Sequence, residues 1–217
     1  MKRLSASGAA ALIKEGMTVM VGGFLTRGTP QALMDALVAA GTGRLTIIGN
    51  DGGLPGSGIG KLVDAGLVAA MNISHLGLNP AIGRLMNEGK IRVQLTPQGT
   101  LAEQVRAAGA GLGGVLTPTG IGTEVAQGKQ VLEIGGKQYL LEMPVRADVA
   151  LLRGSIVDKM GNVFYRGTTK NFNPLMAMAA DVVIVEAERI VEVGELDSEL
   201  IMTPGIFVDY VVKEGEA

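Results

Sequence analysis

The sequence predicts an α/β fold, with a mostly parallel sheet flanked by helices and a small β-hairpin insertion. Short apolar runs alternate with helical patterns four times in the first half of the chain, and strands buried on both faces of a parallel sheet read as such runs. The 33 glycines are dispersed among these runs, as expected where strands turn tightly into helices. Apolar residues make up 47% of the 217 residues, which is enough for one large α/β core.

The N-terminal segment, residues 1–16, has a basic start and a short apolar stretch. Gly8 and the pair Lys14-Glu15 interrupt that stretch, so we interpret it as an amphipathic helix and not as a signal peptide. No run of 18 apolar residues follows in the chain, which argues against a membrane span. We therefore expect a soluble, cytoplasmic protein.

The first strand–helix unit is the clearest of the four. The run "TVMVGG" at 18–23 is continuous and apolar, which favours a buried strand. A helix over 29–41 follows, because Thr29 can cap it, Pro30 suits its first position and Gly41 can end it.

Three further units follow the same pattern. We expect their strands at 44–51 and 68–77, a strand followed by a turn at 91–100, and their helices at 60–66, 79–90 and 100–112. Asn79 followed by Pro80 is a typical helix start. Four successive units of this kind predict parallel strands joined by right-handed crossovers.

The second half of the chain departs from this regularity. A Gly/Thr/Pro-rich stretch at 109–125 predicts a long loop, and two alternating runs at 129–143 predict a hairpin that turns at Gly135-Gly136. Further strands are expected at 147–158, 182–190 and 206–212, with a helix at 173–181 capped by Asn173. We expect one domain over 1–217, with the hairpin insertion at about 126–144.

Composition excludes several classes of function. The net charge is −2 without a basic block and aromatic residues make up 3%, so neither nucleic acid nor an anionic membrane is an expected partner. The chain has no cysteine and a single histidine, His75. Thiolate metal sites, cysteine nucleophiles and a Ser-His-Asp triad are therefore not expected, and we predict no metal site.

A glycine loop follows the first strand, in the stretch "VMVGGFLTRGTP" at 19–30. Gly23 and Gly28 have the spacing of a P-loop, but no lysine follows, and the dinucleotide-binding spacing also fails. A strand, a glycine loop and a helix start can present N–H groups to an anion or a polarised carbonyl. The alternative that the glycines form only a tight turn stays open on spacing alone.

Longer motifs resemble a known family. The stretch "EGMTVMVGGFLTRGTP" at 15–30 is similar to the signature of the α subunit of family I CoA-transferases, the acetate/acetoacetate and 3-oxoacid type. It departs only at Glu15, where the family usually has Asp or Asn. The segments at 96–123 and 166–186, which contain "TPQGT" and "NFNPL", also resemble this family, so the resemblance spans nearly the whole chain.

The resemblance implies an exchange of CoA between an acyl-CoA and a short-chain carboxylic or 3-oxo acid, as in short-chain fatty acid and ketone body metabolism. Family members use a glutamate in a Ser-Glu-Asn-Gly motif of the β subunit, which forms an acyl anhydride and then a glutamyl-CoA thioester. This chain lacks that motif. It is therefore expected to act only with a β subunit, in an α2β2 heterotetramer, with coenzyme A as a substrate and no tightly bound cofactor.

The resemblance also assigns site residues. Gln98 is the expected donor to the oxyanion, with a turn residue bonded to the backbone as its alternative. The CoA-binding loop, whose N–H groups would meet the pantetheine amides or the diphosphate, is expected to comprise Gly22, Gly23, Phe24, Leu25, Thr26, Arg27 and Gly28. Further candidates are Asn50, beside Asp51 at the end of a strand, and Gly113 and Gly114, in a stretch that is either a flap or a close-packed turn.

Three other residues receive no role: His75, Glu103 and Glu124. Two alternative functions remain at this point. One is a sugar-phosphate-binding or regulatory α/β domain without transferase chemistry, and the other is an NAD-dependent enzyme. The sequence does not decide which acids are exchanged, since a single methylene changes discrimination by only ~1–3 kcal/mol.

Overall fold

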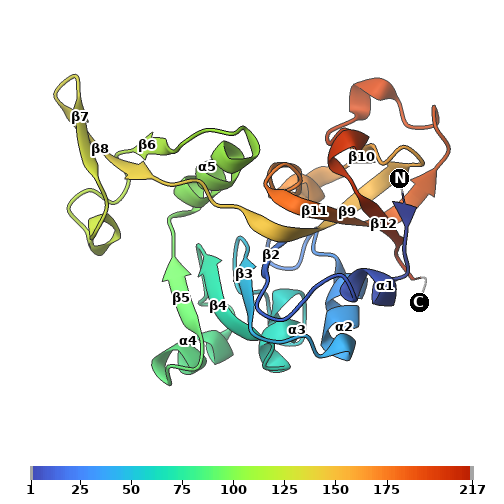
Figure 1. Ribbon diagram of the computed structural model, residues 1–217, viewed down its shortest axis with the longest axis horizontal. Coiled ribbons are helices and arrows are strands. Elements are labelled where there is room, and N and C mark those ends of the chain that lie inside the picture. The colour runs from blue at the N-terminus through green and yellow to red at the C-terminus, as the bar shows by residue number, and fades with distance from the viewer. Residues whose placement is uncertain (1, 216–217) are drawn as a thin grey trace.

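The computed structural model describes residues 2–215, and its main feature is a twisted, mostly parallel sheet (Figure 1). Within these residues the sheet has nine strands, in the order β1-β12-β11-β9-β2-β3-β4-β5, with β10 paired antiparallel to β9 and all other pairs parallel. The strands are β1 Lys2–Arg3, β2 Thr18–Val21, β3 Leu45–Ile48, β4 Val68–Ile73, β5 Arg92–Leu95, β9 Ala147–Asp158, β10 Val163–Phe164, β11 Ala180–Val191 and β12 Tyr210–Lys213. The predicted fold class is confirmed.

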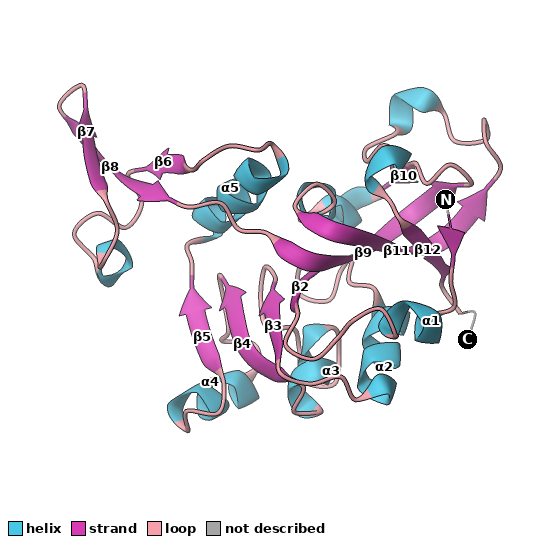
Figure 2. Ribbon diagram, in the orientation of Figure 1, coloured by secondary structure: helices cyan, strands magenta, loops and turns pink. Residues whose placement is uncertain are grey.

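Helices cover both faces of this sheet (Figure 2). They are α1 Ala6–Ala10, α2 Gln31–Ala40, α3 Ile59–Asp64, α4 Pro80–Asn87, α5 Gln98–Gly109 and α6 Asn173–Met176. Helices α1 to α4 pack with Val19 and Val21 of β2 in one core, whereas α5 and α6 pack with Met20 in a second core on the opposite face. This alternation follows from the two-residue period of a strand, and it explains why β2 reads as a continuous apolar run.

Two helix starts differ from the prediction. Thr29 does not cap α2, whose Leu33 N–H donates instead to Glu186 Oε2 at 3.0 Å, from β11 on the other half of the chain. Asn173 does not cap α6 either, because its side-chain amide bonds to other segments. By contrast, the capping role of Asn79 is confirmed, since its Oδ1 accepts from Ala81 N–H at 3.3 Å.

The two ends of the described chain also differ in detail from the expected elements. In place of one amphipathic helix there is the short strand β1, followed by the five-residue helix α1. The last strand, expected at 206–212, is β12, and a single 3₁₀ turn at Gly205–Phe207 precedes it. No helix in residues 2–215 is long and apolar enough to cross a membrane.

A small antiparallel sheet extends from the main body as an arm (Figure 1). It contains β6 Val115–Thr117, β7 Val131–Ile134 and β8 Lys137–Glu142, in the order β6-β8-β7. The predicted hairpin is confirmed, and it turns at Gly135-Gly136. The expectation of an unbroken loop over 109–125 was wrong, because β6 pairs there with β8.

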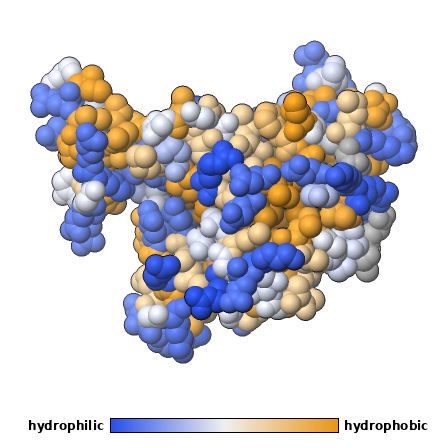
Figure 3. All heavy atoms as spheres, viewed as in Figure 1, coloured by the Kyte–Doolittle hydropathy of each residue, from blue (hydrophilic) through white to orange (hydrophobic). Residues whose placement is uncertain are grey.

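The arm is joined to α5 by a buried polar cluster. Glu142 accepts a hydrogen bond from Gln104 Nε2 at 3.0 Å and forms an ion pair with Lys129 at 2.6 Å. Apolar side chains nevertheless remain exposed on the arm (Figure 3), among them Leu116, Val131 and Ile134. The single domain expected over 1–217, with the arm as an insertion in it, stays a prediction.

Candidate active site

The candidate site lies where the carboxyl ends of β2 and β3 approach the start of α5. A pocket of about 300 Å³ opens there, lined by Phe24, Asn50, Gln98, Ala102, Asn171, Phe172 and Leu175. Phe24 belongs to the loop after β2, Asn50 follows β3, and Gln98 begins the helix after β5. Ligands of open parallel sheets bind at these strand ends. Three residues proposed from the sequence, distant from one another in the chain, thus surround one pocket.

The glycine loop, Gly22–Gly28, folds into a very short hairpin. The N–H and C=O groups of Phe24 and Arg27 bond to each other at 2.9 Å in both directions. Leu25 and Thr26 form the turn with positive φ angles of 47° and 69°. Such primed turns normally use Asn or Gly, so two side-chain-bearing residues are strained here.

Asp51 stabilises this strained turn. Its Oδ2 accepts a hydrogen bond from Leu25 N–H at 2.9 Å and another from Asn50 Nδ2 at 3.0 Å, while Oδ1 accepts from Gly53 N–H at 2.8 Å. The side chain is buried. The end of β3 therefore positions both Asn50 and the turn of the glycine loop.

Close packing explains why the loop begins with two glycines. A Cβ atom on Gly22 would lie 1.8 Å from Asn173 Oδ1. Gly23 has a φ of 123°, and a Cβ there would lie 1.9 Å from Thr29 Oγ1. Any larger residue would displace the neighbouring side chain or the loop itself.

Most N–H groups of this loop already have partners. Gly22 N–H donates to Leu151 O, Gly23 N–H to Asn171 Oδ1, and Leu25 N–H to Asp51. Among the described residues, only the N–H groups of Thr26 and Gly28 within the loop lack a hydrogen bond. A full array of free N–H groups, as the sequence led us to expect, is therefore not present, and of the two unpaired donors only that of Thr26 belongs to a residue that is not buried.

Gln98 is the first residue of α5, after Pro97, and its side chain is exposed. Within the described part of the chain its side-chain amide makes no hydrogen bond. The alternative for Gln98 was a turn residue whose side chain bonds to the backbone, and no such bond is present among the described residues. Its amide N–H groups can donate to a ligand in the pocket.

The remaining candidates lie elsewhere. Gly113 and Gly114 precede β6, and a Cβ on Gly114 would meet Leu141 and Glu142 of β8. Neither glycine lines the pocket. Arg27 is exposed at the base of the glycine loop.

The residues left without a role also lie outside the pocket. Glu103 pairs with Arg106 at 2.6 Å on α5, and both line a separate space against β6. Glu124 begins a 3₁₀ turn in the arm. His75 is exposed, and its backbone pairs with Asp51 beyond β4.

Sequence reasoning missed the wall of the pocket formed by Asn171, Phe172 and Leu175. The motif "NFNPL" contained these residues, but nothing local indicated that they approach the glycine loop. The two asparagines on either side of Phe172 were the available signal, because short amides in an irregular segment commonly bond to nearby backbone.

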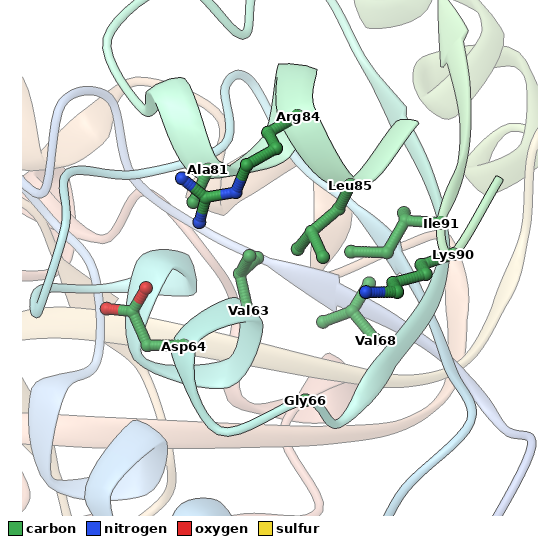
Figure 4. Close-up of a pocket in the computed structure, with 9 residues that line it drawn as sticks. All are labelled: Val63, Asp64, Gly66, Val68, Ala81, Arg84, Leu85, Lys90 and Ile91. Atoms are coloured by element: carbon green, nitrogen blue, oxygen red, sulfur yellow. The ribbon is translucent and has the colours of Figure 1, made fainter. Parts of the chain in front are cut away.

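A larger pocket, of about 420 Å³, lies between α3 and α4 (Figure 4). Arg84 and Lys90 line it together with the apolar side chains of Val63, Leu85 and Ile91. It lies beside the beginning of β4, the end of a parallel strand opposite to the one where ligands bind. Lys90 is exposed and already paired with Glu88 at 2.8 Å. Size alone therefore does not make it the active site.

Comparisons with known proteins agree on one family. Residues 3–214 match the model of the family described as Coenzyme A transferase. An acetoacetyl-CoA:acetate/butyrate CoA transferase alpha subunit from Clostridium acetobutylicum is 53% identical over 204 residues, covering 94% of each chain. The acetate CoA-transferase subunit alpha of Escherichia coli K12 is 48% identical, over 100% of this chain and 98% of its own.

Solved structures show the same fold. An acyl-CoA transferase from E. coli O157:H7, in a thioester complex with CoA, superposes with a TM-score of 0.84 at 26% identity. The match covers 98% of this chain but only 47% of the other, so the present chain spans about half of that longer protein. Glutaconate coenzyme A-transferase from Acidaminococcus fermentans has a TM-score of 0.84 at 21% identity, which shows the fold alone.

Proposed function

The chain belongs to the coenzyme A transferase family, and from this premise we propose that it is the α subunit of a heteromeric CoA-transferase. The enzyme would move CoA between an acyl-CoA and a short-chain carboxylic or 3-oxo acid. The observation that carries the proposal is the pocket that gathers Phe24, Asn50 and Gln98 at the carboxyl ends of the strands. Relatives named as alpha subunits at 53% and 48% identity support the subunit assignment.

The pocket can bind and polarise a thioester but lacks a nucleophile. Among the described residues that line it there is an exposed amide, that of Gln98, and no carboxylate. The whole sequence also lacks Ser-Glu-Asn-Gly. We therefore assign the attacking glutamate to a partner β subunit, with the complete site at the interface between the two chains.

The proposed reaction begins when that glutamate carboxylate attacks the thioester carbonyl carbon. The carbon–sulfur bond breaks, CoA leaves as a thiolate, and an acyl-glutamyl anhydride remains. The thiolate then attacks the glutamyl carbonyl, which releases the first acid and leaves glutamyl-CoA. An incoming carboxylate repeats these steps in reverse and departs as the new acyl-CoA.

Gln98 would donate its amide N–H to the carbonyl oxygen as negative charge develops there. A donor in this position lowers such a barrier by ~3 kcal/mol. The free N–H group of Thr26 and the exposed Arg27 are the loop groups assigned to CoA, whereas Gly28 is buried. Phe24, whose side chain is half exposed at the pocket, would contact the apolar part of the thioester.

Acetate and butyrate are the acids named for a relative, and we propose acids of this size for the present chain. A cytoplasmic location, an α2β2 assembly and the absence of a tightly bound cofactor belong to the same proposal. The family match supports neither the sugar-phosphate-binding or regulatory domain nor the NAD-dependent enzyme.

The test compares the purified chain with the chain co-expressed with a partner that carries Ser-Glu-Asn-Gly. Transfer from acetyl-CoA to butyrate should be absent for the chain alone and present for the pair. Robust transfer by the isolated chain would overturn the two-subunit proposal. Thermal stabilisation by sugar phosphates, with none by CoA in either sample, would favour the alternative domain.

A further inference from the structure

The segment at 171–173 reaches across the molecule to the glycine loop. Asn171 directly follows the 3₁₀ turn Gly167–Lys170, and Asn173 is the first residue of α6. Both residues are far from the glycine loop in sequence. Both side-chain amides bond to loop backbone. We infer that Asn171 and Asn173 are positioning residues that hold the glycine loop in its site-forming conformation.

Asn171 joins the two ends of the short loop hairpin. Its Oδ1 accepts from Gly23 N–H at 3.2 Å, and its Nδ2 donates to Arg27 O at 2.9 Å. The same Nδ2 donates to Thr168 O at 2.6 Å. One side chain thus fixes the entrance and the exit of the turn that Leu25 and Thr26 form.

Asn173 fixes the exit of the loop to the centre of the sheet. The residue is fully buried. Its Nδ2 donates to Gly28 O at 3.0 Å and Thr169 O at 2.7 Å, while its Oδ1 accepts from Arg153 N–H of β9 at 3.1 Å. A buried amide with these bonds satisfied is costly to move, and the missing Cβ of Gly22 provides the space it occupies.

The same segment also forms the pocket. Asn171, Phe172 and Leu175 line it together with Phe24 and Gln98, so a shift of the asparagines changes the loop and this wall of the pocket together. Because Asn171 accepts from the Gly23 N–H and the hairpin pairs those of Phe24 and Arg27, the half-buried Thr26 keeps an N–H group without a partner among the described residues. The inference that this arrangement serves acyl-CoA rests on the proposed function, whereas the loop conformation itself does not.

The experiment replaces Asn171 by Asp, which keeps the shape and the acceptor for Gly23 N–H but removes both donor bonds. The amide exchange of Gly23 and Leu25 in the full-length chain is measured by NMR. Neither amide loses its own acceptor in this variant. We nevertheless expect exchange at least about tenfold faster, because the loss of the two donor bonds to Arg27 O and Thr168 O makes the loop open more readily. Asn171→Ala, which removes the acceptor as well, should give a larger increase. Asn87→Asp, at the exposed end of α4, is the matched control and should leave exchange at both sites unchanged.

The second readout is steady-state transfer by the chain with its β partner. Asn171→Asp should raise the KM for acyl-CoA about tenfold while kcat changes less than about threefold. The reason is that the proposed role of the loop is to bind acyl-CoA, and not to take part in the chemical steps. Unchanged exchange would overturn the positioning role itself. Faster exchange with an unchanged KM would overturn its link to acyl-CoA. If the wild-type pair shows no transfer, the proposed function fails, and the exchange data still decide whether Asn171 holds the loop.

Discussion

Two glycine-rich segments of this chain look alike in sequence but differ in structure. Backbone N–H groups of the loop Gly22–Gly28 donate to the side chains of Asp51 and Asn171, and the Asn173 side chain donates to a loop carbonyl. These three side chains come from distant parts of the chain. The segment at 109–114 ends α5 with local bonds, such as Leu112 N–H to Ala107 O at 2.9 Å. The first lies at a pocket with Gln98 and Asn50, and the second leads into the arm.

The difference shows what a count of glycines does not reveal. At Gly22 the absent Cβ admits a buried amide, whereas at Gly113 no heavy atom lies within 4 Å of where a Cβ would stand. Long-range bonds from side chain to backbone, and not glycine content, distinguish the loop at the candidate site from the segment that leads into the arm.

The largest expected effect is that of Gly22→Ala. The new Cβ would overlap Asn173 Oδ1 at 1.8 Å, so we expect the free energy of unfolding to fall by about 3 kcal/mol. Gly113→Ala is the matched variant in the other segment, and its free energy of unfolding should stay within about 0.5 kcal/mol of the wild type. Urea denaturation of both variants measures the contrast. Equal changes would contradict the distinction between the two segments.

The next effect concerns Gln98 within the first region. Gln98→Ala should lower kcat for transfer about 100-fold, with little change in the KM for acyl-CoA, because its amide is argued to act on the developing oxyanion. The exposed Gln127 of the arm provides the control, since Gln127→Ala should leave both parameters unchanged. An unchanged kcat for Gln98→Ala would remove this residue from the mechanism.

A smaller effect concerns the pH dependence of the free energy of unfolding. It arises from Glu186, which contacts the start of α2, the helix that follows the glycine loop. Glu186 is fully buried, accepts from Leu33 N–H at the start of α2, and lies 3.7 Å from Arg153. Burial raises the pKa of its carboxyl above the usual 4.5, and the hydrogen bond from Leu33 and the charge of Arg153 oppose this rise. The folded protein therefore holds this proton more tightly than the unfolded chain does.

Stability linked to Glu186 is consequently present below pH 4.5 and declines as the pH rises from there towards the raised pKa of the folded state. Glu186→Gln removes this titration. The wild type should lose stability relative to Glu186→Gln above pH 4.5, by at most about 1.4 kcal/mol for each pH unit. Thermal or urea unfolding at a series of pH values tests this, and a difference that is constant with pH would contradict it. The 109–114 segment has no comparable buried carboxylate among its described hydrogen-bond partners.

Much of the fold could be predicted because the main strands are buried on both faces. Strand β9 and strand β11 pair along ten residue positions, and each contains a short apolar run, "VALL" at 149–152 and "VVIV" at 182–185. Strand β6 could not be predicted, because its three residues gain their structure from β8, as in the pairing of Val115 with Glu142. Thr29 is a residue type that commonly caps helices, but at the start of α2 the Leu33 N–H donates to the carboxylate of Glu186 instead. Glu186 is distant in sequence, so no local pattern predicts this bond.

The residues of the candidate site also fall into two groups, those that the sequence indicated and those that only the structure revealed. Phe24, Asn50 and Gln98 come after the ends of β2, β3 and β5, and Phe24 and Gln98 also belong to family-like motifs, so the sequence pointed to them. Asn171 is 148 residues from Gly23 and 144 from Arg27. Only the folded chain brings such groups together, and no local pattern predicts that contact.

We propose that acyl-CoA binds at the glycine loop and not at the other glycine-rich segment. Hydrogen–deuterium exchange of the complex with the β partner, measured with and without acyl-CoA, distinguishes the two. We predict slower exchange in residues 22–28 and 171–175 on binding, and no change in 109–114 or around the α3–α4 pocket. Protection at 109–114 or at that pocket, with residues 22–28 unaffected, would contradict this binding site.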